Sequence, residues 1–500
     1  MATPTCCGDY VTEALLIAQP AVPVAIAGLV LLAPSGRVAD RLNLAGAVLT
    51  AAIATTLVVL ALTAAPGAAA AGSWLTLDVA AGVFLALAAA VGLASAVVSP
   101  AYLRHAGRSW FGERRSHVYY YAAFNLFWAA LLTLPLAANL ALAWLLIEGT
   151  TAASALLVSF SGKRSALEAG WKYLVLTTLG LGVALLGIIV LYAAVGGHGP
   201  ESLGWDALAA AAPGLPAQAT LFAFVLIVVG LAAKIGWAPV HNWLPDAHSE
   251  APPPISALLS AVLLPTVLLI AWRTQLALEP VVGETAIREL FLGFGLLSLA
   301  VAVPFLWRPL PWKRLLAYSS LEHMGILALG IGFGTPLAIA GVVVHLAGHA
   351  IAKSLGFYTA IPLLRQDPGA ARRAARGVAR FSPSTAGAMT VSLVSLAALP
   401  PSPLFASELL VLLGGIEAGQ LAVAAVAAVL LALGFLGLAH ALLEGLFGGR
   451  GKRGTGPSPR SARAVALLAT VAFVALMALT VVACLLPGSE LVQGLTGATT

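Results

Sequence analysis

Charged residues are scarce in this sequence. They make up 9% of the 500 residues, whereas 60% of the residues are hydrophobic and the mean hydropathy is +0.98. Soluble domains carry about 25% charged residues, so this composition excludes a soluble globular fold for most of the chain. Long apolar runs of helix length, without short alternating strands, favour a helical membrane bundle over a β-barrel.

Cysteine is also rare, with three in the chain: Cys6, Cys7 and Cys484. They form no CxxC pair and have no histidine at metal-ligand spacing, which excludes an iron–sulfur cluster or a structural zinc site in this chain. The first ten residues, MATPTCCGDY, lack the basic start of a cleavable signal peptide. Residues 14–34 are therefore expected to form a retained membrane span.

Hydropathy over a window of about 20 residues predicts fourteen membrane spans. They cover roughly residues 14–34, 43–65, 80–99, 117–135, 137–160, 171–194, 219–239, 254–272, 286–306, 312–331, 335–362, 384–413, 418–446 and 463–486.

The positions of lysine and arginine test this count of spans. Alternating loops place 22 of the 26 basic residues on one side, Arg273 and Arg288 on the other side, and Lys234 and Lys353 inside spans. Because basic loops stay in the cytoplasm, the basic side is expected to be cytoplasmic and both termini to lie outside. The pI of about 9.4 therefore needs no nucleic-acid partner.

Three acids join the two lysines inside the predicted spans: Glu148, Glu322 and Glu408. Each buried charge costs about 2.5–3.5 kcal/mol on membrane-insertion scales. Residues this costly face the bundle interior, pair with one another and mark ion or proton paths. Structural ion pairs that lock helices together are the alternative interpretation.

The stretch HLAGHAIAK places His345, His349 and Lys353 four residues apart. At about 100° per residue they lie within an arc of about 80° and cover about 12 Å of one helix face. Neutral imidazole accepts a proton on one nitrogen and releases one from the other, so the stripe suits a proton relay. A histidine pair can also bind zinc, but HEXXH is absent and the lysine would repel the cation. Satisfied core histidines are the remaining alternative.

Proline interrupts two of the predicted spans. Residues 234–254 read KIGWAPVHNWLPDAHSEAPPP, and residues 396–410 read LAALPPSPLFASELL. Pro239 disrupts the first helix, and backbone freed there must line a cavity or be covered by protein. Two broken spans at matching places, each with one ionisable residue, are typical of an inverted-repeat transporter.

The sequence therefore predicts an all-α integral membrane protein of about 14 transmembrane helices. It would contain two inverted five-helix repeats, each with a broken helix. The expected parts are an N-terminal three-helix region, the first repeat, the second repeat, and a basic cytoplasmic loop with the last helix, over residues 1–116, 117–275, 276–447 and 448–500.

Four motifs in order between about residues 230 and 415 resemble one family. They read LAAKIGWAPVHNWLPDAHSEAPPPISALLSAVLL, KRLLAYSSLEHMGI, HLAGHAIAKSLGF and LPPSPLFASELLVLL, and WLLIEGTTAASALLVSF with ALEAGWKYL extends the match to about residue 140. They are similar to the proton-pumping, antiporter-like membrane subunits of respiratory complex I, membrane-bound hydrogenases and Mrp-type antiporters. The IEGTT, AGWKYL and SSLEHMG segments are most similar to hydrogenase-4 component F.

This resemblance implies roles for single residues. Glu148 corresponds to the fifth-span acid that pairs with Lys234, the seventh-span lysine, and Lys172 falls where relatives often carry a basic residue. The remaining relay residues are the tenth-span His323 beside Glu322, the eleventh-span His345, His349 and Lys353, and the twelfth-span terminal Glu408.

One position departs from the family. Many complex I relatives place a lysine or histidine in the eighth span, where this chain reads LLSAVLLPTVLL with Ser260 and Pro265. Ordered water, with Ser260 or His248 assisting, is one way to bridge the gap. A half-channel that does not conduct is the other.

The resemblance implies a proton-translocating membrane subunit of a redox-driven complex, either hydrogenase-4-like or NADH:quinone oxidoreductase-like, in a prokaryotic inner membrane. No redox cofactor is expected in this chain, whereas partner subunits would hold iron–sulfur clusters and a nickel–iron centre. Expected partners are other membrane and peripheral subunits, the lipid bilayer and protons, with Na⁺ as an alternative ion. The rival hypotheses are a subunit of a cation/proton antiporter or inorganic-carbon uptake system, and a non-conducting scaffold of the same fold.

Overall fold

The computed structural model describes residues 6–63, 70–72, 74–104, 115–197, 199–449, 459–486, 489 and 492. Of the predicted basic cytoplasmic loop, residues 450–458 lie outside the described residues. The predicted all-α class is confirmed: 13 helices among the described residues are long and apolar enough to cross a membrane. A short antiparallel pair, β1 (Ala70–Ala71) and β2 (Leu75–Thr76), is the only ladder in this described part of the chain.

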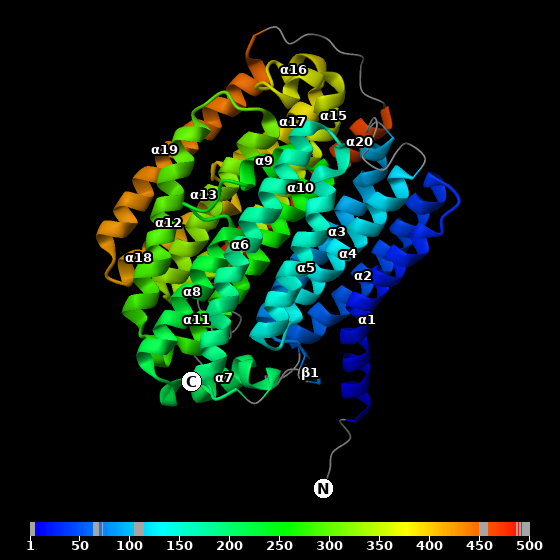
Figure 1. The fold of residues 1–500 in the computed structure, drawn as a ribbon. Coiled ribbons are helices and arrows are strands. Elements are labelled where there is room, and N and C mark those ends of the chain that lie inside the picture. The colour runs from blue at the N-terminus through cyan, green and yellow to red at the C-terminus, as the bar shows by residue number, and fades with distance from the viewer. Residues whose placement is uncertain are drawn as a thin grey trace. The chain divides into compact units, whose positions relative to one another are not determined.

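The chain divides into two compact units, each of which is described by itself. Unit 1 comprises Met1–Ile235 and Val262–Glu284. Its helices, marked in Figure 1 where there is room, are α1 (Cys6–Leu31), α2 (Gly36–Thr63), α3 (Val79–Leu103), α4 (Ser116–Thr133), η1 (Leu134–Leu136), α5 (Leu140–Val158), η2 (Ser159–Ser161), α6 (Arg164–Ala194), η3 (Pro200–Leu203), α7 (Trp205–Ala211), η4 (Ala212–Gly214), α8 (Ala217–Ile235) and α11 (Leu264–Val282).

Unit 2 comprises Gly236–Ala261 and Thr285–Thr500. Its elements are α9 (Leu244–Glu250), α10 (Pro253–Leu258), the first residues of the π-helical turn η5 (Leu259–Leu263), α12 (Glu284–Leu306), α13 (Trp312–Phe333), α14 (Pro336–Tyr358), α15 (Ala360–Gln366), η6 (Pro368–Ala371), α16 (Val378–Phe381), α17 (Pro383–Leu396), α18 (Pro403–Glu417), α19 (Leu421–Phe447) and α20 (Pro459–Leu485). The predicted repeat boundaries, and the inverted relation between the repeats, stay a prediction.

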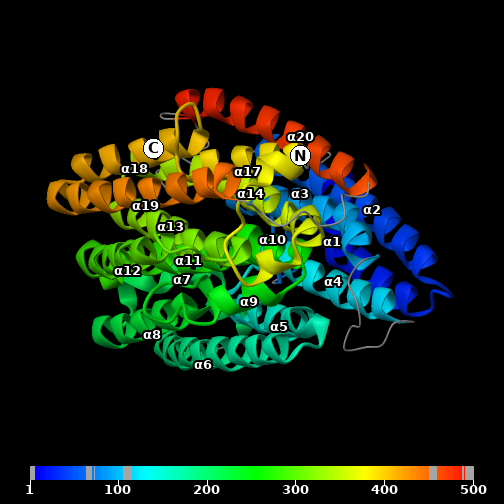
Figure 2. The ribbon, with the colours of Figure 1, turned by 90° about the horizontal axis from the view of Figure 1, so that it is seen from above.

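In unit 1, α8 packs along α6 and contacts α11, and its Lys234 reaches Thr151 of α5. Figure 2 shows α5, α6 and α8 side by side when the protein is viewed from above. A Cβ added to Gly230 of α8 would lie 2.4 Å from the backbone nitrogen of Ala184 on α6. Glycine therefore permits the close approach of these two helices, which is how small residues act at membrane helix contacts.

In unit 2, α14 is the central helix and contacts α10, α13, α17, α18 and α20. A Cβ on Gly341 of α14 would lie 2.8 Å from the carbonyl oxygen of Ser407 on α18, so these helices also approach closely at a glycine. Residues of α12, α13, α18 and α19 form an apolar cluster beside them, among them Leu299, Ile326 and Val411.

The first predicted interruption is present, and protein covers the freed backbone. α8 ends at Ile235, four residues before Pro239. Within unit 2, the Ala238 N–H donates to Ser298 Oγ at 3.1 Å, and the Trp237 indole donates to the Met324 carbonyl at 2.9 Å. These contacts satisfy polar groups that lipid could not.

The second interruption divides the twelfth predicted span. α17 ends at Leu396 and α18 begins at Pro403, so neither half is as long as the 13 candidate spans. Ser402 accepts the Leu404 N–H at 3.2 Å and thereby caps α18. Thirteen long helices and one divided span thus account for the fourteen predicted spans.

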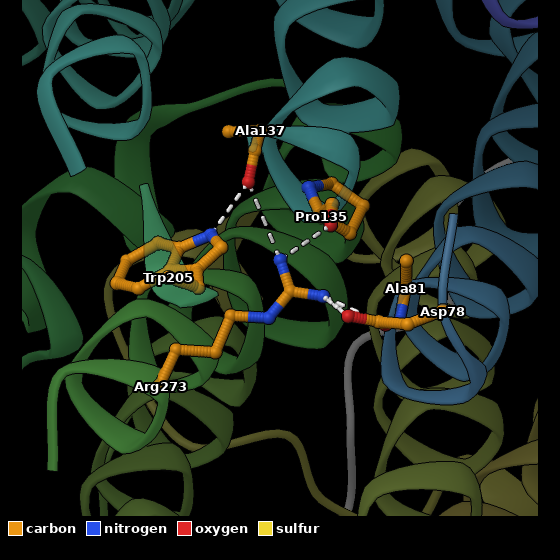
Figure 3. A network of polar contacts seen from close by, with 6 residues as sticks. All are labelled: Asp78, Ala81, Pro135, Ala137, Trp205 and Arg273. Carbon is orange, nitrogen blue, oxygen red and sulfur yellow. Dashed lines mark hydrogen bonds and ion pairs between the residues drawn. The ribbon is translucent and has the colours of Figure 1, made fainter. Parts of the chain in front are cut away.

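A buried arginine ties four elements of unit 1 together (Figure 3). Arg273 of α11 is 7% exposed, and one guanidinium nitrogen donates to both carboxylate oxygens of Asp78 at 2.7 and 2.6 Å. Asp78 also caps α3 by accepting the Ala81 N–H at 2.6 Å. The other terminal nitrogen of Arg273 donates to the Pro135 carbonyl at 2.9 Å, and the guanidinium lies 5.8 Å from the Trp205 ring. The sequence placed Arg273 on the side opposite the basic loops, and the structure buries its side chain there.

Candidate functional site

Lys234 lies fully buried in the last turn of α8. Its ammonium donates to the hydroxyl of Thr151 on α5 at 2.7 Å and to the hydroxyl of Tyr173 on α6 at 2.5 Å. It also lies 4.5 Å from the centroid of the Tyr173 ring, where the π face attracts a cation. Two hydroxyls and one ring therefore hold the lysine of unit 1.

These hydroxyls belong to a longer chain. Tyr173 Oη is 2.7 Å from Ser154 Oγ, and Ser154 Oγ donates to the Thr150 carbonyl at 2.5 Å. Each hydroxyl can donate one hydrogen bond and accept others, so a proton can be exchanged at each step. The ammonium of Lys234 stands at one end of this chain.

Glu148 lies on α5 three residues before Thr151, and therefore on the same helix face. One of its carboxylate oxygens accepts from Thr178 at 3.0 Å, and the other is buried without a hydrogen-bond partner among the residues described. No carboxylate in the described part of unit 1 forms an ion pair with Lys234. Glu148 and Lys234 therefore share one helix cluster without direct contact.

Lys172 lies in a different environment from its neighbour Tyr173. It is 44% exposed on α6 and forms an ion pair with Glu168 at 2.6 Å, one helical turn earlier. An exposed pair of this kind contributes little to stability. The adjacent residue Tyr173 is the one that contacts Lys234.

Lys353 of α14 is the buried lysine of unit 2. Its ammonium donates to the Leu316 carbonyl at 2.6 Å and makes a short hydrogen bond to the hydroxyl of Ser319, both on α13. A hydroxyl and a backbone carbonyl thus replace the two hydroxyls found around Lys234.

Three histidines gather beside this lysine on α13 and α14, and all are fully buried. His323 Nδ1 and His345 Nε2 are 3.0 Å apart, so the N–H of one ring donates a hydrogen bond to the other ring. The His349 ring centroid lies 5.0 Å from that of His323 and 6.4 Å from that of His345. The predicted histidine stripe is therefore completed by a third imidazole from the neighbouring helix.

The histidines continue to α18. His345 Nδ1 is 2.9 Å from Ser407 Oγ, and Ser407 Oγ is 2.7 Å from the Leu404 carbonyl. Ligand atoms of His323, His345 and Glu408 lie within 4.8 Å of one another, close enough to consider a metal ion. However, His323 Nδ1 and His345 Nε2 share a hydrogen bond, so a proton lies between these two nitrogens and they do not both point a lone pair at a metal ion. This arrangement suits proton transfer better than metal ligation.

Glu322 lies next to His323 on α13 and is 3% exposed. A Cβ on Gly434 of α19 would lie 1.9 Å from Glu322 Oε1, so the carboxylate occupies space that only glycine leaves free. Glu322 Oε2 is buried and has no partner in the described segments.

His248 and Ser260 lie near the predicted gap in the relay. His248 is buried in α9, with Nδ1 2.9 Å from the Leu244 carbonyl and its ring 5.7 Å from that of Phe357 on α14, one turn beyond Lys353. Ser260 lies in the π-helical turn, and its hydroxyl is 2.7 Å from that of Ser320 on α13. π-helical turns are frequent at functional sites.

The hydroxyl residues of these clusters were not predicted from the sequence. All of them lie within the quoted motifs: Thr151, Tyr173, Ser319 and Ser407 are next to or one turn from a predicted ionisable residue, and Ser154 is six residues from Glu148. Helical periodicity could have placed Thr151 on the Glu148 face. It could not have shown that α5 and α6 turn those hydroxyls towards α8.

Comparison with known proteins gives a family match. The model of the family described as NADH:quinone oxidoreductase/Mrp antiporter, TM, matches residues 137–434. A hydrogenase-4 component F homolog of Methylacidiphilum infernorum is 31% identical over 357 residues, which are 71% of this chain and 75% of that protein. NADH-quinone oxidoreductase subunit N of Desulforudis audaxviator is 32% identical, over 70% of this chain and 68% of that protein.

Solved structures share the fold. A chain of the membrane-bound sulfane sulfur reductase, an archaeal respiratory membrane complex, superposes with a TM-score of 0.82 at 23% identity and covers 97% of both chains. A chain of the Mrp complex from Dietzia sp. DQ12-45-1b gives a TM-score of 0.81 at 20% identity, over 98% of this chain and 97% of that one.

Proposed function

The chain belongs to the NADH:quinone oxidoreductase/Mrp antiporter transmembrane family, and we propose that it is the proton-translocating membrane subunit of a redox-driven complex. The family and the candidate spans make it a multi-pass integral membrane protein. The observation that carries the proposal is the pair of fully buried lysines, Lys234 and Lys353, each hydrogen-bonded to groups on neighbouring helices. An ionised lysine inside the membrane is costly, and such residues mark ion or proton paths.

Unit 1 supplies the lysine that loads and releases a proton. Lys234 is held by the hydroxyls of Thr151 and Tyr173, which can donate or accept as the amine changes its protonation state. Glu148, on the same face of α5 as Thr151, biases that lysine through its charge. Lys172, the exposed basic residue next to Tyr173, is also included in the proposed relay.

Unit 2 supplies a line of groups that carry the proton, from Lys353 through three histidines to Glu408. Lys353 passes its proton to the imidazoles of His349, His323 and His345, which lie with ring centroids 5.0 to 6.4 Å apart. Glu408 is the terminal group. Glu322 and His248 flank the line and tune it through their charge and hydrogen bonds.

The redox chemistry of the proposed complex belongs to partner subunits, which hold iron–sulfur clusters and a nickel–iron centre. Their reaction would shift the charge near Glu148 and so drive the release of a proton from Lys234. The protein would lie in a prokaryotic inner membrane with its basic loops in the cytoplasm and both termini outside.

A lysine substitution tests this proposal. Lys234→Met keeps an unbranched side chain that is one atom shorter and removes its charge, so the intact complex in inside-out vesicles should lose its proton pumping while it retains electron transfer. Lys163→Met, at an exposed position just before α6, is the matched control. Undiminished pumping by Lys234→Met, with assembly confirmed, would remove the lysine from the mechanism.

The ion is tested in the same vesicles. Pumping in a medium without Na⁺ is expected to equal pumping with Na⁺, because the line consists of groups that carry protons. Strict dependence on Na⁺ would favour a cation/proton antiporter instead.

A further inference from the structure

The helices α1, α2 and α4 carry buried polar side chains that the proposed relay does not use. Gln19, Asn43 and Thr50 have no exposed surface, and Asn125 is 1% exposed. All four lie in helices that are long and apolar enough to cross a membrane. Polar groups are costly in such surroundings unless something satisfies them.

A cluster of titratable groups stands where α2 and α4 begin. Asp40 Oδ1 accepts from the Tyr121 hydroxyl at 2.7 Å and lies 3.2 Å from His117 Nδ1. Asp40 and His117 are half-buried, and Arg37 and Arg41 are exposed at the same end of α2. This is therefore the basic end of α2, and the carboxylate of Asp40 and the imidazole of His117 lie beside it.

From Asp40 and His117 the buried polar side chains continue along α4 and α2. Tyr121 and Asn125 lie four residues apart on one face of α4, and Asn125 donates to Asn43 Oδ1 of α2 at 2.8 Å. Asn43 and Thr50 are seven residues apart, which returns to the same face of α2. Ten residues separate Asp40 from Thr50, so the line covers about 15 Å of helix and reaches the middle of α2.

Gln19 reaches the same level from α1. A Cβ on Gly46 would lie 2.5 Å from Ile26 Cγ1, so α1 and α2 touch at this pair. The two helices are antiparallel neighbours, and Gln19 lies seven residues before Ile26. It is therefore level with residues about seven beyond Gly46, within one turn of Thr50. Figure 2 shows α1, α2 and α4 close together.

Five polar atoms in this line have no hydrogen-bond partner in the described helices. They are both amide atoms of Gln19, Nδ2 of Asn43, Oγ1 of Thr50 and Oδ1 of Asn125. Polar residues that serve only to join membrane helices bond to one another across the contact. Here Tyr121 bonds to Asp40 and Asn125 bonds to Asn43, whereas the five atoms bond to no described residue. Buried polar atoms without a protein partner take water as their partner.

We propose that α1, α2 and α4 enclose a column of bound water from Asp40 and His117 to the level of Gln19 and Thr50, and that protons enter unit 1 along it. Its ligands are water and the hydrated proton. Beyond Thr50 the buried positions of α2 are apolar, Ala54, Leu57 and Ala61, so the column ends halfway along α2. The uptake of protons rests on the proposed function, whereas the water column does not.

Accessibility to silver ion tests the column, because Ag⁺ is small, needs water and binds thiolates. In the intact complex with Cys6, Cys7 and Cys484 replaced by serine, single cysteines are placed at Asn43 and Thr50. Controls are Leu49→Cys, 52% exposed on the apolar face of α2, and Ala54→Cys, which is fully buried. Thiols react as thiolates, so Asn43→Cys and Thr50→Cys should lose free thiol at least about ten-fold faster than both controls. Equal rates at all four positions would overturn the column.

Proton uptake is tested separately with Asn43→Leu and Thr50→Val, which leave the other residues of the column in place. Proton pumping should fall several-fold in each, and Leu49→Ala should pump normally. Normal pumping by both variants, with silver access shown, would overturn the uptake role and leave the column. If the complex with the unaltered chain pumps no protons while silver still reaches residue 50, the proposed function fails and the column stands.

Discussion

Replacing Tyr173 with phenylalanine isolates one hydroxyl of the Lys234 cluster. The substitution keeps the ring, and with it the contact at 4.5 Å from the lysine ammonium. It removes the hydroxyl that accepts from Lys234 at 2.5 Å and lies 2.7 Å from Ser154. We expect proton pumping to fall while the protein folds and assembles normally.

The size of the effect follows from these contacts. A hydrogen bond to a charged group is worth about 1.5–3 kcal/mol, and in the variant Lys234 retains Thr151 as its one hydroxyl partner among the described residues. Each 1.4 kcal/mol is about a factor of ten in an equilibrium constant, so loading of the lysine should become at least about ten-fold less favourable. Because the site is fully buried, bulk water cannot readily replace the lost hydroxyl.

The assay is proton pumping by the intact complex in inside-out vesicles, normalised to electron transfer. Tyr192→Phe is the matched control, since Tyr192 lies on the same helix and its hydroxyl accepts only a loop N–H, that of Gly199, at 3.1 Å among the contacts described. Pumping should drop about ten-fold in Tyr173→Phe and stay unchanged in the control. Equal pumping by both variants would refute the role assigned to the hydroxyl.

Three further substitutions test unit 2 and the buried arginine. Ser407→Ala leaves His345 Nδ1 without its hydroxyl partner, a loss of about 1–3 kcal/mol, so pumping in vesicles should fall several-fold; full pumping would contradict this. Gly434→Ala should reduce the free energy of unfolding by about 1–3 kcal/mol, because the added Cβ meets the Glu322 carboxylate, and the thermal midpoint in detergent should fall. Gly293→Ala places its Cβ in open space and should leave the midpoint unchanged. Arg273→Leu removes the guanidinium that donates to both carboxylate oxygens of Asp78, so the free energy of unfolding should fall by about 1–3 kcal/mol and the thermal midpoint should fall with it. An unchanged midpoint would show that the network is dispensable.

Much of the fold could be predicted because lipid imposes simple rules on sequence. Long apolar runs gave the spans, and prolines gave the two interruptions at Pro239 and before Pro403, since proline cannot continue the hydrogen-bonding of a helix. Boundaries were less accurate. The sixth predicted span starts at residue 171, whereas α6 begins at Arg164, because amphipathic end residues extend a helix beyond its apolar run.

The site was predicted only in part, because charge is visible in a sequence and orientation is not. A lysine inside an apolar run is conspicuous, so Lys234 and Lys353 stood out. A serine or tyrosine in a membrane helix is common, and its role depends on which neighbour it faces. The contacts of Tyr173 and Ser407 arise from helix packing at glycines, at distances that no spacing in the sequence encodes.

The choice of partners around Lys234 bears on how a proton could be released. A carboxylate in direct contact would hold the protonated amine strongly, because charges attract far more in a buried site than in water. Hydroxyls stabilise the ammonium less and can also donate to the neutral amine, so Thr151 and Tyr173 remain partners in either protonation state. In the proposed mechanism, Glu148, held apart on the same face of α5, then shifts the protonation of Lys234 without trapping the proton. In unit 2 the imidazoles of His323 and His345 have the same property, since each ring can exchange donor and acceptor across the 3.0 Å between them. Both units thus surround a buried lysine with groups whose hydrogen bonds reverse, which is the requirement for passing a proton onwards and a poor arrangement for a permanent structural ion pair.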